Sequence, residues 1–323
     1  GGLEYQYNSL HDVMTGYGRD LRQDVKIASG FVQNEWKLDY FTILAGFRLD
    51  KHNLVDNVIF SPRINTLWKP SDKFQGRLTW STGFRAPQAY DEDLHVAAVG
   101  GEAMEVRLAE GLKPERSNSF SGSVDWSFNF GHFQSNLLIE GFYTALNDVF
   151  YLESLGKDPV SGTLVQERRN GNGARVYGAN IDYKIAHGKE AQLQLGFTVQ
   201  RSRYTEAVRW SEDEDVAAIK RMPRTPDYYG YFTFSSAPLK NFDFSLSGVY
   251  TGRMIVPHFA GYIEKDCLEH TPDFMDFNLK LNYTFVLNDH LKLQVNGGVQ
   301  NIFNAFQKDL DKGMNRDSKY FYG

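Results

Sequence analysis

Aromatic and cationic side chains recur in the long polar segments of this chain, and these residue types bind anionic or aromatic small molecules. An arginine supplies charge and hydrogen-bond donors, while a tyrosine or tryptophan supplies a flat face for stacking. The alternative is that these side chains only pack one loop against another. We expect the ligand-binding residues to come from the set Tyr90, Arg209, Trp210, Arg253, His258 and Tyr262.

Patterns for metal binding and catalysis are much weaker. His258, Cys267 and His270 share one polar segment, but their irregular spacing favours scattered loop residues over a transition-metal site. Acidic residues at 212–215 and 309–317 could hold calcium, yet the second segment lacks the glutamate that ends a calcium loop, and solvated loops are the better expectation. The sequence contains no nucleophile elbow, phosphate-binding loop or HExxH motif. We therefore expect no enzyme, no cofactor and no metal site.

The overall composition excludes two classes of protein. Lysine and arginine number 35 against 40 aspartate and glutamate, so the net charge of −5 gives no basic field for nucleic acid. Hydrophobic residues make up 41% and aromatic residues 15%, which is too apolar for a disordered chain. No stretch approaches the roughly 20 consecutive apolar residues of a membrane-spanning helix. A contact with a membrane would therefore have to be made by strands.

Apolar and polar residues alternate through most of the chain, which is the pattern of β-strands with one apolar and one polar face. In residues 74–85, Phe74, Leu78 and Trp80 fall on one side, and Arg77 and Arg85 fall on the other. The pattern predicts an all-β, antiparallel fold of about thirteen strands. The same split places Val124, Trp126, Leu193, Leu195, Phe197, Leu279, Leu281, Leu293 and Val295 on the apolar side, and Gln194, Lys280 and Gln294 on the polar side.

Connections between the predicted strands alternate in length, which indicates a short end and a long end. An alternating polar face, aromatics near strand ends and this asymmetry are typical of outer-membrane barrels. A soluble sandwich also alternates, but its turns need not segregate by length. A ligand arriving from outside would meet the long segments first. Short turns lie at 38–40, 69–72, 129–132, 187–189, 238–241 and 288–290, and long segments at 88–116, 154–173, 205–225, 255–272 and 306–319.

Five segments, in order along the chain, resemble the barrel of TonB-dependent outer-membrane receptors. They are FSPRINTLWKPSDKFQGRLTWSTGFRAP (60–87), LKPERSNSFSGSVDW (112–126), IEGFYTALNDVFYL (139–152), VYGANIDYKI (176–185) and GGVQNIFNAFQKD (297–309). The resemblance implies a transmembrane barrel of about 22 strands around an N-terminal plug. Residues 1–323 would be one partial barrel domain of about 13–14 strands. The plug, the early strands and most of the last strand are then expected to lie outside this sequence.

Three charged residues on the predicted polar face stand inside these matching segments. Arg63 lies in the SPR motif, Arg85 in GFRAP and Glu115 in LKPE. The resemblance implies that Arg63 and Arg85 contact the plug or a ligand gate, with Glu115 as a partner on the adjacent strand. The alternative is that all three are solvated charges of a hydrated lumen.

The resemblance implies active uptake of a scarce ligand across the bacterial outer membrane, driven by the TonB complex of the inner membrane acting on the plug. The expected ligand is a ferric siderophore or another metal chelate, with cobalamin, haem or a glycan as alternatives. The lipid bilayer and lipopolysaccharide would surround the barrel. A passive diffusion channel and a soluble β-rich binding module are the two other classes of function that the residues leave open.

Overall fold

The computed structural model of the chain describes residues 1–14, 19–87, 104–159, 164–211, 213, 215–258, 263–308 and 320–321. Within these ranges, no helix is long and apolar enough to cross a membrane. All of the regular elements are strands: β1 (Gly2–Met14), β2 (Arg19–Lys37), β3 (Phe41–His52), β4 (Ile59–Ser71), β5 (Phe74–Arg85), β6 (Met104–Leu108), β7 (Glu115–Phe130), β8 (Phe133–Asn147), β9 (Phe150–Lys157), β10 (Leu164–Asn170), β11 (Ala174–His187), β12 (Ala191–Val208), β13 (Ile219–Arg221), β14 (Tyr228–Leu239), β15 (Phe242–Thr251), β16 (Ile255–His258), β17 (Cys267–His270), β18 (Phe274–Val286), β19 (Lys292–Val299), β20 (Gln307–Lys308) and β21 (Tyr320–Phe321).

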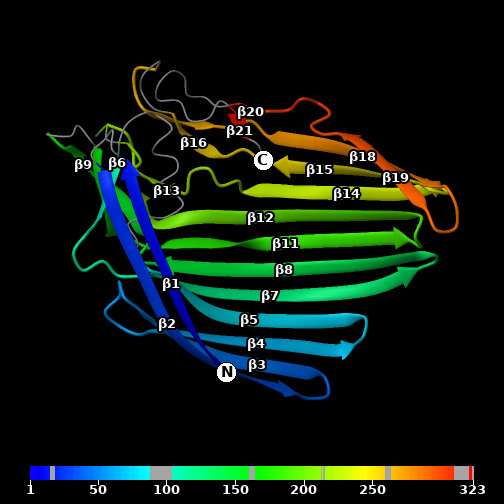
Figure 1. The fold of residues 1–323 in the computed structure, drawn as a ribbon, viewed down its shortest axis with the longest axis horizontal. Helices are drawn as coiled ribbons and strands as arrows, with labels where there is room; N and C mark the ends of the chain where they lie inside the picture. Colours follow the sequence, from blue (N-terminus) through cyan, green and yellow to red (C-terminus); the bar gives the residue numbers. More distant parts are fainter. Residues whose placement is uncertain are drawn as a thin grey trace.

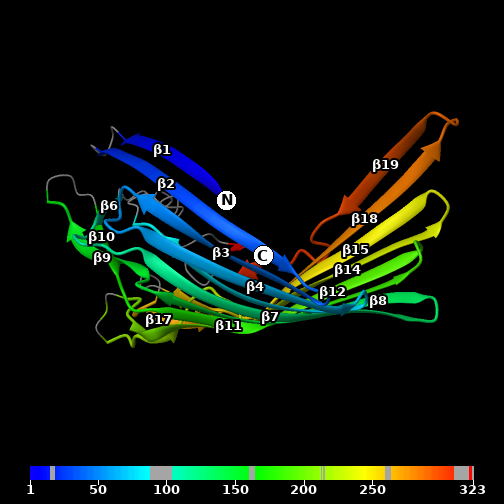
Figure 2. The same cartoon turned by 90° about the horizontal axis from the view of Figure 1, so that it is seen from below.

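One large antiparallel sheet makes up most of the structure (Figure 1). It has 14 strands in the order β1-β2-β3-β4-β5-β7-β8-β11-β12-β14-β15-β18-β19, with β13 added beside β12. The sheet curves into a trough whose rims carry β1 and β19 (Figure 2). Among the described residues, β1 pairs only with β2 and β19 only with β18, so the trough does not close. The all-β, antiparallel fold and its number of strands are confirmed.

The two faces of the sheet differ in polarity, as the alternation predicted. Register partners share a face, and the row Phe74, Trp126, Leu137, Tyr183, Leu195 and Phe232 crosses six strands on one side. All twelve residues predicted to be apolar-facing lie on this side, and Arg77, Arg85, Gln194, Lys280 and Gln294 lie on the other. Many of the apolar side chains stay exposed, including Leu78 at 68% and Leu195 at 40%. The apolar surface therefore faces outward, where lipid can cover it, and does not form an interior core.

The opposite face carries polar networks that cross several strands. The Tyr231 hydroxyl donates to the Asp182 carboxylate (2.7 Å), and the Gln194 side chain donates to the same hydroxyl (2.8 Å). Gly196 makes room for this network, because a Cβ there would lie 2.2 Å from the Tyr231 ring. The arrangement joins β11, β12 and β14 on the side that a barrel would enclose.

The six short turns predicted from the sequence gather at one end of the sheet, and the long connections lie at the other (Figure 1). The connection 53–58, which the length pattern did not predict, joins β3 to β4 at the long end although it is short. It folds inward, because Val55 and Ile59 pack with Ala86 and Phe84 in a small buried cluster. In bacterial outer-membrane barrels the short turns mark the periplasmic end, so in a barrel of that kind the long end would face outward from the cell.

Aromatic residues form a row near each end of the apolar face. Near the short turns, Phe41 stacks with Trp68 (6.4 Å between ring centroids), and Trp68 meets Phe74 edge-on (5.6 Å). Toward the long end, Trp80, Phe120, Tyr143 and Tyr177 are successive register partners, with centroids 6.3 Å apart in the first pair and 6.4 Å apart in the last. We call these four residues the outer aromatic row. Two such rows are typical of the girdles that flank the apolar band of a transmembrane barrel.

Candidate ligand-binding site

The described parts of the long connections carry small sheets of their own. Strand β10 pairs in parallel with β6 and antiparallel with β9, and β16 pairs with β17. The Asn170 side chain donates to the carbonyls of Lys113 and Asp148, while its own oxygen accepts from Lys113 N–H. The connections 86–114 and 148–173 are thereby tied together. Strand pairing and hydrogen bonds therefore order the long end of the sheet, so that it can hold side chains in fixed positions.

Two predicted lumen residues meet at the entrance to β5 and β7. Arg85 and Glu115 are register partners, and the Arg85 Nη1 lies 3.6 Å from a Glu115 carboxylate oxygen. The other Glu115 oxygen accepts a hydrogen bond from Phe150 N–H. The guanidinium groups of Arg85 and Arg168 lie 5.8 and 5.7 Å from the Phe150 ring centroid, and Arg168 is only 3% exposed. We call these four residues the mouth cluster.

The contacts of the mouth cluster are expected to lower the rate at which segment 148–173 is cleaved by a protease. Phe150→Ala removes two cation–π contacts, of which a desolvated one contributes up to about 2 kcal/mol. Proteolysis of the opened segment follows the opening equilibrium, so cleavage is expected to become roughly five to thirty times faster. Limited proteolysis of the folded receptor measures this rate. The control is Leu155→Ala on the same strand, whose side chain is 51% exposed. Equal cleavage of the two variants would contradict the assigned role of Phe150.

Charge pairing also stiffens the small sheet above the mouth cluster. Arg169 on β10 lies 2.5 Å from Glu153 on β9 and 2.5 Å from Glu167 on its own strand. The hydrogen bond to Glu167, followed by the charge of Glu153, raises the pKa of the Arg169 guanidinium. Burial raises the pKa of the Tyr204 phenol near the end of β12. Both groups therefore keep their ordinary charge at neutral pH.

Two neighbouring connections, 209–227 and 252–273, are joined by polar contacts. The Ser211 hydroxyl donates to Asp266 (2.5 Å), and Lys265 pairs with Asp215 (3.7 Å). The Arg224 N–H donates to the Ile255 carbonyl (2.8 Å). Four of the six predicted ligand-binding residues lie in the described part of the chain, and all four belong to these two connections. The structure therefore brings them onto one surface, which the polar contacts above hold together.

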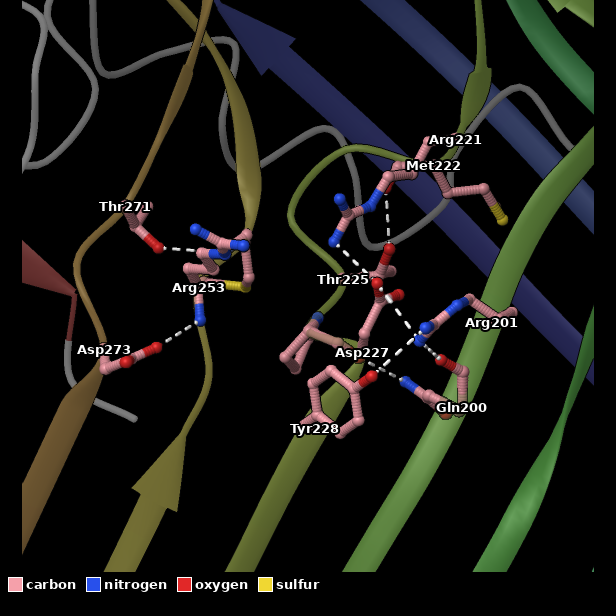
Figure 3. A network of polar contacts seen from close by, with 12 residues as sticks. Gln200, Arg201, Arg221, Met222, Thr225, Asp227, Tyr228, Arg253, Thr271 and Asp273 are labelled. Carbon is pink, nitrogen blue, oxygen red and sulfur yellow. Dashed lines mark hydrogen bonds and ion pairs between the residues drawn. The ribbon is translucent and has the colours of Figure 1, made fainter.

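The four residues differ in their exposure. Arg209 and Arg253 are exposed, and the backbone N–H of Arg253 donates to Asp273 (2.9 Å; Figure 3). Trp210 is half-buried, and its indole N–H donates to the Ala217 carbonyl (3.2 Å). His258, which was predicted to bind ligand, is only 9% exposed on β16, where it pairs with Cys267. Tyr90 and Tyr262 lie outside the described residues.

The remaining predicted lumen residue, Arg63, lies on the polar face of β4. Its guanidinium donates to the Gln33 side chain on β2, across β3. His258, Cys267 and His270, considered above for a transition metal, all lie in the β16–β17 hairpin. In the described part of the chain, no three His, Cys, Asp or Glu side chains are placed to hold a metal ion.

The sequence analysis missed an arginine cluster at the long end of β12. Arg201 and Arg221 converge on the Asp227 carboxylate, at 3.2 and 3.0 Å (Figure 3). Arg201 also donates to the Tyr228 hydroxyl (3.2 Å) and lies 5.3 Å from the centroid of its ring. The signal was present as Arg201 and Arg203, which continue the alternation of β12 beyond its apolar stretch.

Comparison with known proteins adds to this geometry. The family described as TonB dependent receptor-like, beta-barrel matches residues 1–302. An iron-regulated outer membrane virulence protein of Vibrio cholerae is 29% identical over 201 residues, which are 61% of this chain and 29% of that protein. The chain therefore spans less than a third of this relative.

Solved structures share the fold. The siderophore receptor PirA from Acinetobacter baumannii matches with a TM-score of 0.63 and 17% identity, over 93% of this chain and 45% of that one. A variant of the ferric enterobactin receptor from Pseudomonas aeruginosa, solved with enterobactin, matches with a TM-score of 0.66 and 14% identity, again over 93% and 45%. At these identities the likeness establishes the architecture alone.

Proposed function

The chain belongs to the TonB-dependent receptor family, and we propose on that basis that the protein takes up a ferric siderophore or a similar metal chelate. The family places the chain in the bacterial outer membrane as part of a β-barrel. We therefore propose that the whole protein is a transporter and not an enzyme. Because the chain belongs to this family, we propose active transport in preference to the two other classes considered above, the passive channel and the soluble binding module.

The choice of an iron chelate is supported by what the relatives bind and by the chemistry of the long end. One relative is named as iron-regulated, and two solved structures are a siderophore receptor and a ferric enterobactin receptor. In this chain, the exposed Arg209 and Arg253 stand on two joined connections at the outward end. Cationic and aromatic groups suit an anionic chelate with aromatic rings. The proposed recognition surface comprises Tyr90, Arg209, Trp210, Arg253, His258 and Tyr262.

The proposal also concerns how the barrel couples to energy. We propose that residues 1–323 are part of a barrel of about 22 strands, closed around a plug that the TonB complex moves. Arg63, Arg85 and Glu115 lie on the polar face, where a plug would stand. Their role would be to contact the plug or to line the ligand path. The apolar outer face would contact the lipid bilayer and lipopolysaccharide.

The test is uptake by a strain that lacks the gene for the full-length protein. Radiolabelled iron is supplied as one chelate at a time, and labelled cobalamin, haem and a glycan serve as the other arms. We expect uptake of one ferric siderophore to be lost, with the same loss when TonB is deleted. Unchanged uptake of every iron chelate would refute the choice of ligand. Uptake that continued without proton-motive force would refute active transport.

A further inference from the structure

Three arginines stand side by side on adjacent strands at the long end of the sheet. Arg175 on β11 is the register partner of Arg203 on β12, and Arg203 is the partner of Arg221 on β13. Register partners on one face have Cβ atoms about 5 Å apart, and like charges in such positions repel. Arg201 lies one step closer to the middle of the sheet, as the partner of Tyr177. We call these four residues the arginine row.

The arginine row lies on the outward face, not on the face that a barrel encloses. Along β12, the outward positions are Leu193, Leu195, Phe197 and Val199, and the same alternation continues to Arg201 and Arg203. Tyr177 belongs to the outer aromatic row, so Arg201 stands level with that row and the other three arginines stand beyond it. Aromatic girdles mark the level where the apolar band ends. The arginine row is therefore at the depth of the outer-leaflet headgroups.

The charge of the row is mostly unbalanced. Asp227 is the one acid that the described residues place within ion-pair distance, and it is shared by Arg201 and Arg221 (Figure 3). Among the described residues, the buried Arg221 Nε has no hydrogen-bond partner. Across the described ranges, Arg175 and Arg203 make no ion pair, and both side chains are exposed. In the part of the chain that the structure describes, four guanidinium groups thus stand against one carboxylate, which leaves a site for an external anion.

We propose that the arginine row binds the phosphorylated headgroup of a glycolipid in the outer leaflet, which in this membrane is lipopolysaccharide. Guanidinium groups bind phosphate through two parallel hydrogen bonds, and a set of them spread over three strands suits a headgroup with more than one phosphate. The outward position favours a lipid over a transported ligand, because a solute bound there has no route into the lumen. The inference rests on the membrane placement in the proposed function and is independent of which chelate is transported.

The experiment measures lipid retention by the full-length receptor in detergent. Native mass spectrometry compares the wild type with the variant Arg175→Gln/Arg203→Gln, using bisphosphorylated lipid A, dephosphorylated lipid A and a soluble bisphosphorylated disaccharide as probes. The control variant, Arg77→Gln/Lys184→Gln, removes two cations from the inner face. A second variant, Arg175→Lys/Arg203→Lys, keeps the charge. Heat-modifiable migration in electrophoresis verifies that each variant is folded.

We expect the glutamine variant to bind bisphosphorylated lipid A about thirtyfold more weakly, because each arginine near a membrane surface contributes about a fivefold gain in affinity. The control variant should bind like the wild type, and the lysine variant should keep most of the affinity. Equal binding by the glutamine variant and the wild type would overturn the proposal. Binding of dephosphorylated lipid A or of the free disaccharide at the level of the full lipid would overturn it as well. Chelate uptake is a separate measurement, so loss of transport would leave this result unaffected.

Discussion

Leu195→Arg is expected to destabilise the folded barrel by about 2–4 kcal/mol, the cost of an arginine on the lipid face near the bilayer midplane. Leu195 lies within the outward apolar stretch of β12, and its side chain is 40% exposed on that face. An arginine there would have to leave water for hydrocarbon or distort the bilayer around it. The measurement is reversible unfolding of the full-length receptor in lipid vesicles.

The matched control is Gln194→Arg, one residue earlier on the same strand. Gln194 faces the polar side and donates to the Tyr231 hydroxyl, so its replacement costs about 1 kcal/mol for the lost hydrogen bond. An arginine at this position can stay hydrated in the lumen. Equal destabilisation by the two variants would contradict the assignment of the faces, because one-residue neighbours on a strand point to opposite sides.

Simultaneous alanine replacement of Tyr90, Arg209, Trp210, Arg253, His258 and Tyr262 is expected to weaken binding of the cognate chelate at least thirtyfold. A buried aromatic or arginine anchor commonly contributes about 2 kcal/mol or more, and we expect two or three of the six to be anchors. Affinity is measured on the full-length receptor by titration with the chelate that the uptake experiment identifies. Unchanged affinity would move the recognition site to other parts of the receptor.

The burial of His258 calls for two further variants. Because His258 lies inside the β16–β17 hairpin, its replacement could weaken the loop without any contact to ligand. A five-residue variant that keeps His258 separates these effects, and we expect it to lose the same affinity. A control at the opposite end, Leu239→Ala/Lys240→Ala where β14 ends and turns toward β15, should bind like the wild type. Heat-modifiable migration again establishes that each barrel has assembled.

The faces of the strands were predictable from the sequence, whereas the contacts between distant segments were not. A period of two is a local property, so Leu195 and Gln194 could be assigned to opposite faces before any pairing was known. The mouth cluster is different, since Arg85, Phe150 and Arg168 come together only through the β6–β10–β9 sheet. The parallel pairing of β6 with β10 has no local signature in either strand.

The burial of loop residues also depends on strand pairing, and this pairing cannot be predicted from the sequence. His258 stands in a polar segment, and only its place opposite Cys267 shows that it is covered. The arginine row needed the register as well. Neither Arg175 nor Arg203 is a signal for binding when it is considered alone in the sequence. They form a candidate site because the β11–β12 hairpin places them opposite each other.

The joined connections 209–227 and 252–273 have a consequence for how specificity can change. Ser211 with Asp266, and Arg224 with Ile255, make the conformation of each connection depend on residues of the other. Substitutions in the two segments should therefore be epistatic, with effects that do not add. A graft of one loop into a homologue would lose these partners and fold differently. Exchange of ligand specificity by recombination would succeed when both segments are inherited as one unit.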